Sequence, residues 1–268
     1  GGPQTQESHQ AQQRIQRKKN RDKEESGYVK ILPQKSKPGY LVNIFMKNRP
    51  FSIPLFLLVV FCLAGFRKNE CCAQQPGLLK ISFVNTVKGN PLQLDNTIYT
   101  NPFSETYTVT KFKYYISNIA LAFPDGIFKE IDSYHLVNAA DPSSLSFDFT
   151  ASPNTYQSLL FTIGVDSLKN VSGAQTGPLD PLNDMFWTWN SGYIMAKMEG
   201  RSPQSNVVNR KIEYHIGGFA GINNAVKNIK LPVSVIVSTG KTTEIIIEAD
   251  FNTWWQPNNL KIAEFPVC

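Results

Sequence analysis

His135 and His215 are the residues of this chain best suited by type to hold a metal ion. The third histidine, His9, lies in a polar leader. Each of the two follows a tyrosine in a strand-like run, and strand alternation points His215 away from the apolar face of its run. Imidazole suits copper and zinc, so two such strands could bring both rings to one ion. Spacing alone fixes no ligand geometry, and ordinary hydrogen-bonded or solvated histidines are the alternative.

Two tryptophans, Trp187 and Trp189, form a second candidate site. They have strand spacing and therefore share one face, and Ser191 and Gly192 follow at a point where the backbone could approach a neighbour closely. Aromatic core packing is one explanation for such a pair. The functional alternative is a stacking surface for a ligand or a protein partner.

The sequence lacks the short motifs that mark common enzyme classes. Gly-x-Ser-x-Gly, His-Glu-x-x-His and Gly-x-Gly-x-x-Gly are absent. Residues 238–242 end like a phosphate-binding loop, but that motif needs glycine at the position of Val235. We therefore expect a binding protein and not an enzyme, with carboxylate pairs assembled by folding as the open exception.

The segments that must position these side chains have the pattern of β-strands. Strand-like runs separated by turn residues occur at 78–84, 106–123, 127–137, 158–165, 192–198, 211–216, 229–238 and 243–251. Hairpin-type turns are expected at 124–126 and 238–241, and a long loop at 169–184. With 17 Gly, 17 Pro and no heptad pattern, a helical bundle is disfavoured. The pattern predicts an all-β fold, a β-sandwich of mainly antiparallel strands with long loops.

Composition divides the chain into three parts. Residues 1–45 are polar and basic, and we interpret them as a disordered or spurious upstream extension. Residues 46–73 have the form of a signal peptide, with a short basic segment before an apolar run. Residues 74–268 remain as one domain. Cleavage after Ala73 is preferred, with cleavage after Ala64 or an uncut membrane anchor as alternatives.

Charge and cysteine usage limit the partners of the main domain. The chain has a net charge of +6, yet residues 1–73 hold 13 Lys and Arg against five Asp and Glu, and the rest holds 14 against 16. This slightly acidic domain lacks the basic footprint of a nucleic-acid-binding protein. Cleavage after Ala73 leaves Cys268 as its one cysteine, so no internal disulfide is expected. No stable membrane span is expected after signal cleavage.

Several motifs spread over residues 77–255 resemble the MbnP-like family of exported copper-binding proteins. The most specific is MFWTWNSGY at 185–193. The others are KYYISNI at 113–119, YHLV at 134–137, GVD at 164–166, LDP at 179–181, KMEG at 197–200 and YHIGG at 214–218. The resemblance implies a bacterial β-sandwich located in the periplasm or at the cell surface.

The same resemblance implies a mononuclear copper site. Family members bind one copper through two histidines and a tryptophan that a dihaem peroxidase-like partner oxidises to kynurenine, so His135 and His215 would be the ligands here. In related proteins that tryptophan precedes the first histidine by two residues, where this chain has Ser133. The site is then either a plainer His/His site or one that uses Trp187 or Trp189. Further ligands left open are Met195, Met198, Asp250 and a tyrosine hydroxyl.

Overall fold

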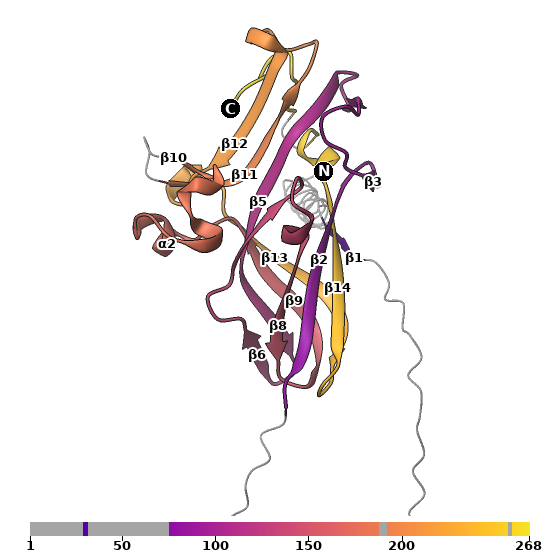
Figure 1. Ribbon diagram of the computed structural model, residues 1–268, viewed down its shortest axis with the longest axis vertical. Coiled ribbons are helices and arrows are strands. Elements are labelled where there is room, and N and C mark those ends of the chain that lie inside the picture. Colours follow the sequence, from indigo (N-terminus) through magenta and orange to yellow (C-terminus); the bar gives the residue numbers. More distant parts are fainter. Residues whose placement is uncertain (1–28, 32–74, 188–191, 257–258) are drawn as a thin grey trace, which may run out of the picture.

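The computed structural model consists mainly of β-strands arranged in two sheets (Figure 1). It describes residues 29–31, 75–187, 192–256 and 259–268. The strands are β1 (Val29–Ile31), β2 (Gly77–Val87), β3 (Asn90–Pro91), β4 (Tyr99–Thr100), β5 (Thr106–Phe123), β6 (Gly126–Lys129), β7 (Tyr134–Asn138), β8 (Ser146–Ala151), β9 (Asn154–Ile163), β10 (Phe186–Trp187), β11 (Gly192–Arg201), β12 (Lys211–Gly217), β13 (Lys227–Val237) and β14 (Thr242–Asp250). The helical turns are η2 (Pro142–Leu145), α2 (Ser167–Val171), η3 (Gly177–Leu179), η4 (Pro181–Asn183), η5 (Val208–Arg210), η6 (Gly221–Asn223) and η7 (Phe251–Trp254).

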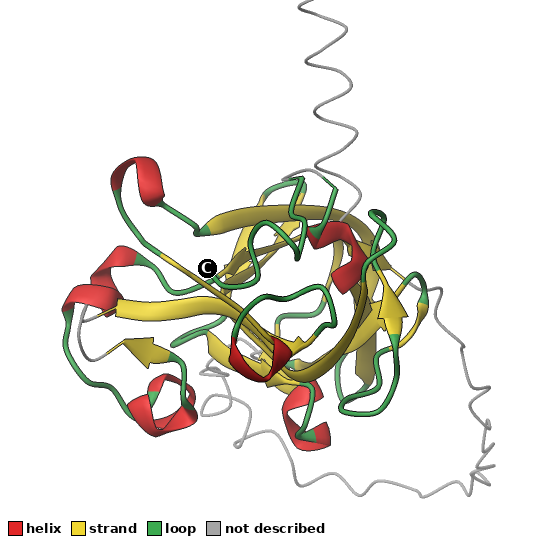
Figure 2. Ribbon diagram, turned by 90° about the horizontal axis from the view of Figure 1, so that it is seen from above, coloured by secondary structure: helices red, strands yellow, loops and turns green. Residues whose placement is uncertain are grey.

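The two sheets face each other as a sandwich. One has the order β1-β14-β2-β3, with β8 also on β2. The other has the order β10-β11-β5-β9-β13, with β12 on β11 and with β4, β6 and β7 on β5. Among these strands β14 and β2 pair in parallel and the other ladders are antiparallel. Seen from above, the strands curve around a shared interior and helical turns lie at its rim (Figure 2). The predicted β-sandwich of mainly antiparallel strands is confirmed.

Strand β5 is the long central strand of the larger sheet. Its first half pairs with β11 and its second half with β9, while β7 and β6 occupy the opposite edge. Asn118 has a φ of 53°, and the register with β9 shifts between Ser117 and Ala120. An irregularity of this kind bends and twists a strand. The strands at both ends of the larger sheet are therefore joined through β5.

Alternate residues of β5 serve two separate apolar clusters. Phe112, Tyr114 and Ile116 belong to the core between the sheets, which also holds Trp255 of the segment after β14. Tyr115 points to the other side of the strand, because successive side chains alternate. There it joins a second cluster with Val165, Leu179, Met185, Tyr193, Ile194 and Met195. The outer face of this sheet is thus partly covered by the segments around η3, η4 and β10.

Three local expectations are corrected by the structure. The run at 127–137 is two strands, β6 and β7, separated by a turn in which Asp132 has a φ of 49°. The turn at 238–241 joins strands of different sheets and closes no hairpin, whereas the hairpin at 124–126 is confirmed. The expected loop at 169–184 contains the end of α2 and both η3 and η4. Proline is the second residue of η3 and the first residue of η4, positions in the first turn that its fixed φ favours.

The predicted signal peptide at 46–73 lies outside the described residues, as does the extension at 1–45 apart from β1. The backbone of β1 pairs with β14. None of the described helices has the length and apolar character needed to cross a membrane.

Glu105 fastens the segment after β14 to the start of β5. Its side chain is buried and accepts hydrogen bonds from the backbone N–H groups of Ile262 and Ala263, at 2.7 and 2.8 Å. The Nδ2 group of Asn101 donates a third bond at 2.7 Å. A buried N–H group that loses its acceptor is destabilising, so one carboxylate holds three donors in place.

We predict that Glu105→Gln lowers the free energy of unfolding by about 1–3 kcal/mol, because an amide nitrogen replaces one of the two acceptor oxygens. Urea denaturation measures the loss. The matched control is Glu264→Gln, which removes an exposed pair with Lys261 and should change stability much less than Glu105→Gln does. Equal losses in the two variants would contradict this role of Glu105.

Candidate metal centre

The outer face of β5, β11 and β12 carries rows of charged side chains. Register places Lys197 opposite His215 on one side and opposite Lys113 on the other. Residues directly opposite each other in a sheet project from the same face. The neighbouring row consists of Glu213, Glu199 and Lys111. Strand pairing therefore gathers six ionisable groups on one surface.

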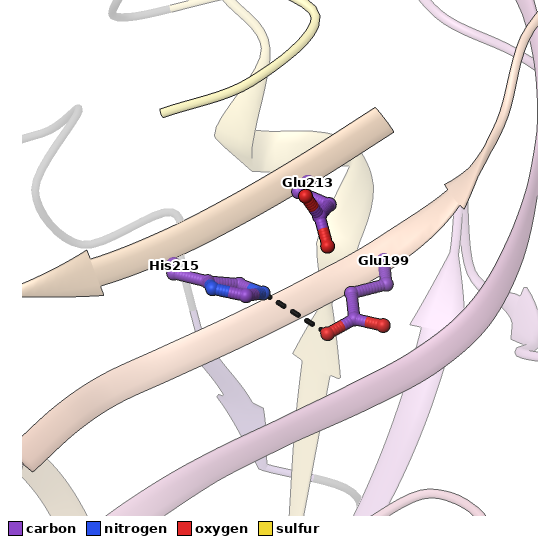
Figure 3. A group of neighbouring side chains, drawn as sticks. All are labelled: Glu199, Glu213 and His215. Atoms are coloured by element: carbon purple, nitrogen blue, oxygen red, sulfur yellow. Dashed lines mark hydrogen bonds and ion pairs between the residues drawn. The ribbon is translucent and has the colours of Figure 1, made fainter. Parts of the chain in front are cut away.

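Three of these side chains have the chemistry of metal ligands (Figure 3). One nitrogen of His215 and one carboxylate oxygen from each of Glu199 and Glu213 lie within 4.8 Å of one another. His215 Nε2 is 3.0 Å from Glu199 Oε1. One nitrogen and two oxygen donors suit Cu(II) or Zn(II). Among the described residues no second group of three histidine, cysteine or acidic side chains comes this close.

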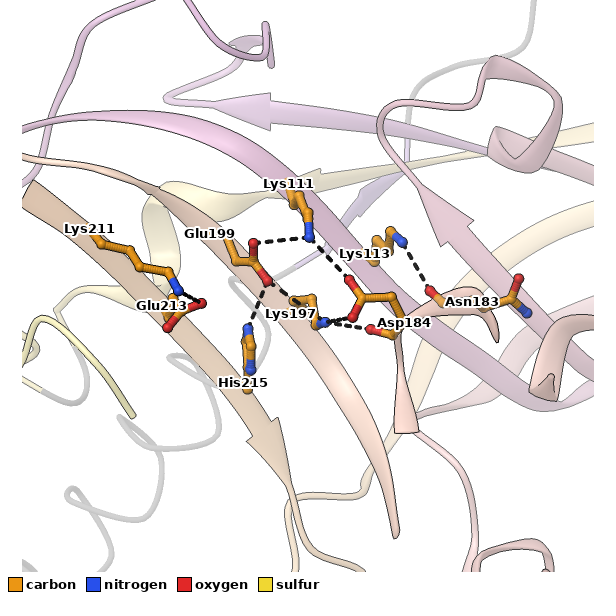
Figure 4. Close-up of polar contacts among 9 residues, drawn as sticks. All are labelled: Lys111, Lys113, Asn183, Asp184, Lys197, Glu199, Lys211, Glu213 and His215. Atoms are coloured by element: carbon orange, nitrogen blue, oxygen red, sulfur yellow. Dashed lines mark hydrogen bonds and ion pairs between the residues drawn. The ribbon is translucent and has the colours of Figure 1, made fainter. Parts of the chain in front are cut away.

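A buried lysine lies beside this group. The Lys197 side chain is 2 % exposed, and its Nζ lies 3.0 Å from Asp184 Oδ1 and 3.7 Å from Glu199 Oε1. It also donates a hydrogen bond to the backbone carbonyl of Asp184. An ammonium group without such partners would lose several kcal/mol on leaving water. Lys197 therefore ties the turn between η4 and β10 to the sheet (Figure 4).

Two lysines of β5 extend the network. Lys111 Nζ is 3.2 Å from Glu199 Oε2 and 3.1 Å from Asp184 Oδ2. Burial opposes protonation of Lys111, but its bonds to Asp184 and Glu199 outweigh burial and raise its pKa. Lys113 donates to the carbonyl of Asn183 at 3.0 Å, and burial lowers its pKa. Both lysines thus contact the segment that covers the sheet (Figure 4).

The carboxyl groups at the centre of the network are held in their ionised form. Burial would raise the pKa of Glu199, but hydrogen bonds from Lys111 and His215 and the charge of Lys197 lower it. Burial acts in the same way on Asp184, whose pKa is lowered by its bonds to Lys197 and Lys111. Glu199 is therefore a carboxylate at neutral pH, the form that binds metals. An ion bound here competes with Lys111 and Lys197 for the oxygens of Glu199, and with Lys211, whose Nζ is 2.5 Å from Glu213 Oε1, for those of Glu213.

His135, the other predicted ligand, lies on the opposite face of the same sheet. It is paired with Ile116, whereas the outward row of His215 crosses β5 at Lys113, three residues away. An odd separation along a strand reverses the direction of the side chain. His135 stacks on Phe147 of the facing sheet, with 3.5 Å between ring centroids. The two imidazoles do not converge on one ion in this fold.

His135 has partners of its own. Its Nε2 atom is 3.0 Å from both carboxylate oxygens of Glu130. Ser133 donates to Glu130 at 2.5 Å and accepts from the N–H group of Ile119 at 2.9 Å. At the position where the resemblance implies a tryptophan, a buried hydroxyl therefore orients the carboxylate that holds His135. This arrangement fits the alternative of a hydrogen-bonded histidine.

Trp187 packs against the strand that carries His215. A Cβ atom added at Gly217 would lie 2.2 Å from Cζ3 of the Trp187 ring, so only glycine allows this contact. Gly217 is two residues beyond His215, which places the indole on the same face of β12. Trp187 is half-buried beside the outer apolar cluster. Trp189 lies outside the described residues.

Three of the further ligands left open by the sequence, Met198, Met195 and Asp250, have other surroundings. Met198 is buried in the core between the sheets. Met195 Sδ accepts a hydrogen bond from the N–H group of Val165 at 3.1 Å. Asp250 Oδ1 accepts from the backbone of Lys88 and Asn252. Asp250 does not belong to the group around His215.

The sequence indicated part of this site. The outward direction of His215 is confirmed, because Ile212 and Tyr214 of the same strand enter the core. The sequence alone does not identify Glu199, Glu213 or Lys197 as site residues. The signal that could have found them is the alternation in Lys197-Met198-Glu199, in which a buried methionine separates two charged residues.

We predict that Glu199→Gln destabilises the fold by about 1–3 kcal/mol at pH 7, because it removes a charged partner from Lys197 and Lys111. The lowered pKa of Glu199 means that its contribution is complete above the ordinary value of 4.5 and is lost as pH falls through the lower folded value. Denaturation of wild type and variant between pH 7 and pH 3 should therefore show a difference that narrows with acid. A difference independent of pH would contradict this assignment.

Comparison with known proteins places this fold in a family. A family model described as MbnP matches residues 76–268. No curated protein sequence matches the chain. A solved structure of MbnP from Methylosinus trichosporium is similar, with a TM-score of 0.43 and 12 % sequence identity over 59 % of this chain and 71 % of that one. The family match covers more than half of the chain and includes both sheets. The chain therefore belongs to the MbnP family.

Proposed function

We propose that this protein is an exported copper-binding protein with one site centred on His215, Glu199 and Glu213. The observation that carries the proposal is the approach of one imidazole nitrogen and two carboxylate oxygens within 4.8 Å. Membership of the MbnP family supports copper as the metal, and Cu(II) leads the divalent series in affinity for such donors. The proposed role is binding and handling of copper, without catalysis.

The site is open to an ion from solvent but is held in place by its surroundings. The side chains of His215, Glu199 and Glu213 are 23 %, 14 % and 20 % exposed. Ion pairs with Lys197 and Lys111 hold the carboxylate of Glu199 in place. Fixed ligands lose less freedom on binding, and partial exposure leaves a path for the metal.

The proposed site uses one of the two histidines implied by the resemblance. His135 faces the other sheet and is held by Glu130, so it takes no part. Trp187 lies on the face that carries His215, which makes it the candidate for oxidation by a dihaem peroxidase-like partner. The alternative of a metal-free aromatic surface gains no support from Trp187, because its ring packs against Gly217. A location in the periplasm or at the cell surface follows from the signal-like segment at 46–73.

The test is titration of the purified full chain with Cu(II), followed by calorimetry and by electron paramagnetic resonance. We expect one equivalent to bind with nitrogen coupling in the spectrum. His215→Ala should remove that coupling and weaken binding at least about tenfold, and Glu213→Gln should weaken it less. The matched control is His135→Ala, which should leave affinity and spectrum unchanged.

Three results would overturn this proposal. The first is the absence of stoichiometric copper binding by the wild-type protein. The second is equal copper affinity in wild type and His215→Ala, and the third is a loss of affinity confined to His135→Ala. Thermal unfolding of each variant without copper shows whether it has kept its fold.

A further inference from the structure

Both arginines of the main domain line a single cleft. Residues 74–268 contain 12 lysines but two arginines, Arg201 and Arg210. Arg201 ends β11 and Arg210 ends η5, and both line a cleft of about 540 Å³ beside the start of β5. A guanidinium group binds carboxylate and phosphate with two parallel hydrogen bonds, which an ammonium group does not. The presence of both arginines in the lining of one cleft therefore points to an anionic ligand.

The two guanidinium groups keep donors for a ligand. Among the described residues, the side chain of Arg201 makes no hydrogen bond or ion pair, and it is exposed. Arg210 donates from Nη1 to the carbonyl of Ser205 at 2.9 Å. This bond uses one of its five N–H groups and leaves the others. Neither arginine forms an ion pair with a carboxylate among the described residues.

Three residues that line the same cleft have a left-handed backbone conformation. Asp95, Asn209 and Arg210 all line it, and their φ angles are 70°, 61° and 56°. Residues other than glycine rarely adopt such angles, and those that do gather at sites that clamp ligands. The turn is held by a hydrogen bond from the N–H group of Ser202 to the carbonyl of Arg210 at 2.9 Å. This bond fixes the backbone of Arg210 next to the end of β11, which carries Arg201.

The remaining lining residues narrow the class of ligand. Asp95 adds a carboxylate that pairs with neither arginine, so a ligand needs a hydrogen-bond donor as well as an anionic group. Ile98, 71 % exposed, and Pro203 add apolar surface. We propose that this cleft binds a small organic oxyanion that also carries a hydroxyl group. A hydroxycarboxylate and a sugar phosphate share this chemistry.

The experiment is calorimetric titration of the full chain with citrate and, separately, with glucose 6-phosphate. At least one probe should bind at a ratio of one to one, and the affinity should fall as sodium chloride is raised. Arg201→Gln and Arg210→Gln should each weaken binding at least about tenfold. Arg201→Lys should also weaken it, because it keeps the charge but loses the paired donors. The control Lys230→Gln removes an exposed charge on β13 and should bind as wild type does.

The preferred probe identifies the anion as carboxylate or phosphate. Saturable binding of neither probe, or equal affinity in wild type and Arg201→Gln, would overturn the proposal. Unchanged thermal unfolding of the variants shows that any loss is not a folding defect. Arg201→Gln should bind copper as wild type does, because no hydrogen bond or ion pair joins Arg201 to the three proposed copper ligands among the described residues.

Discussion

The buried ammonium group of Lys197 is the constraint on which the outer face of the larger sheet depends. A cation with 2 % exposure requires negative partners within bonding distance, and Asp184 and Glu199 provide them. Asp184 brings the turn before β10 onto the sheet, and Glu199 in turn positions His215 and Lys111. The same charge therefore fixes a covering loop and orients a ligand group. Lys197 thus stabilises the fold and positions the proposed metal ligands through the same contacts.

The alternation of side chains gives the larger sheet two chemically different faces. The inner face carries the aromatic core and receives His135 at its edge, stacked on Phe147 of the other sheet. The outer face carries lysines, acids and His215 beside a small apolar cluster. Two histidines that look equivalent in the sequence thus enter different environments. His135 is held between the ring of Phe147 and the carboxylate of Glu130, whereas His215 lies among the charged side chains of the outer face.

Local sequence was sufficient for much of the fold and for the direction of single side chains. The bounds of β5 follow from a strand-like run that ends at a turn, and the outward direction of His215 follows from alternation within β12; both are confirmed. The break at Asp132 depends on a left-handed turn residue that alternation does not reveal. The grouping of Glu199 with His215 depends on the register of β11 against β12, which shifts between Ile194 and Ala196. This register depends on contacts between residues far apart in the sequence, so a local sequence pattern does not predict it.

The parallel pairing of β2 with β14 joins the beginning of the sandwich to its end. Ser82 donates a hydrogen bond to Glu244, 162 positions later, and Thr86 does the same with Glu248. Contacts of such sequence separation slow folding, because the entropy of closing the loop is lost before the contact is gained. During synthesis, β2 emerges long before its parallel partner. One edge of β2 therefore stays without that partner until nearly the whole domain has been made.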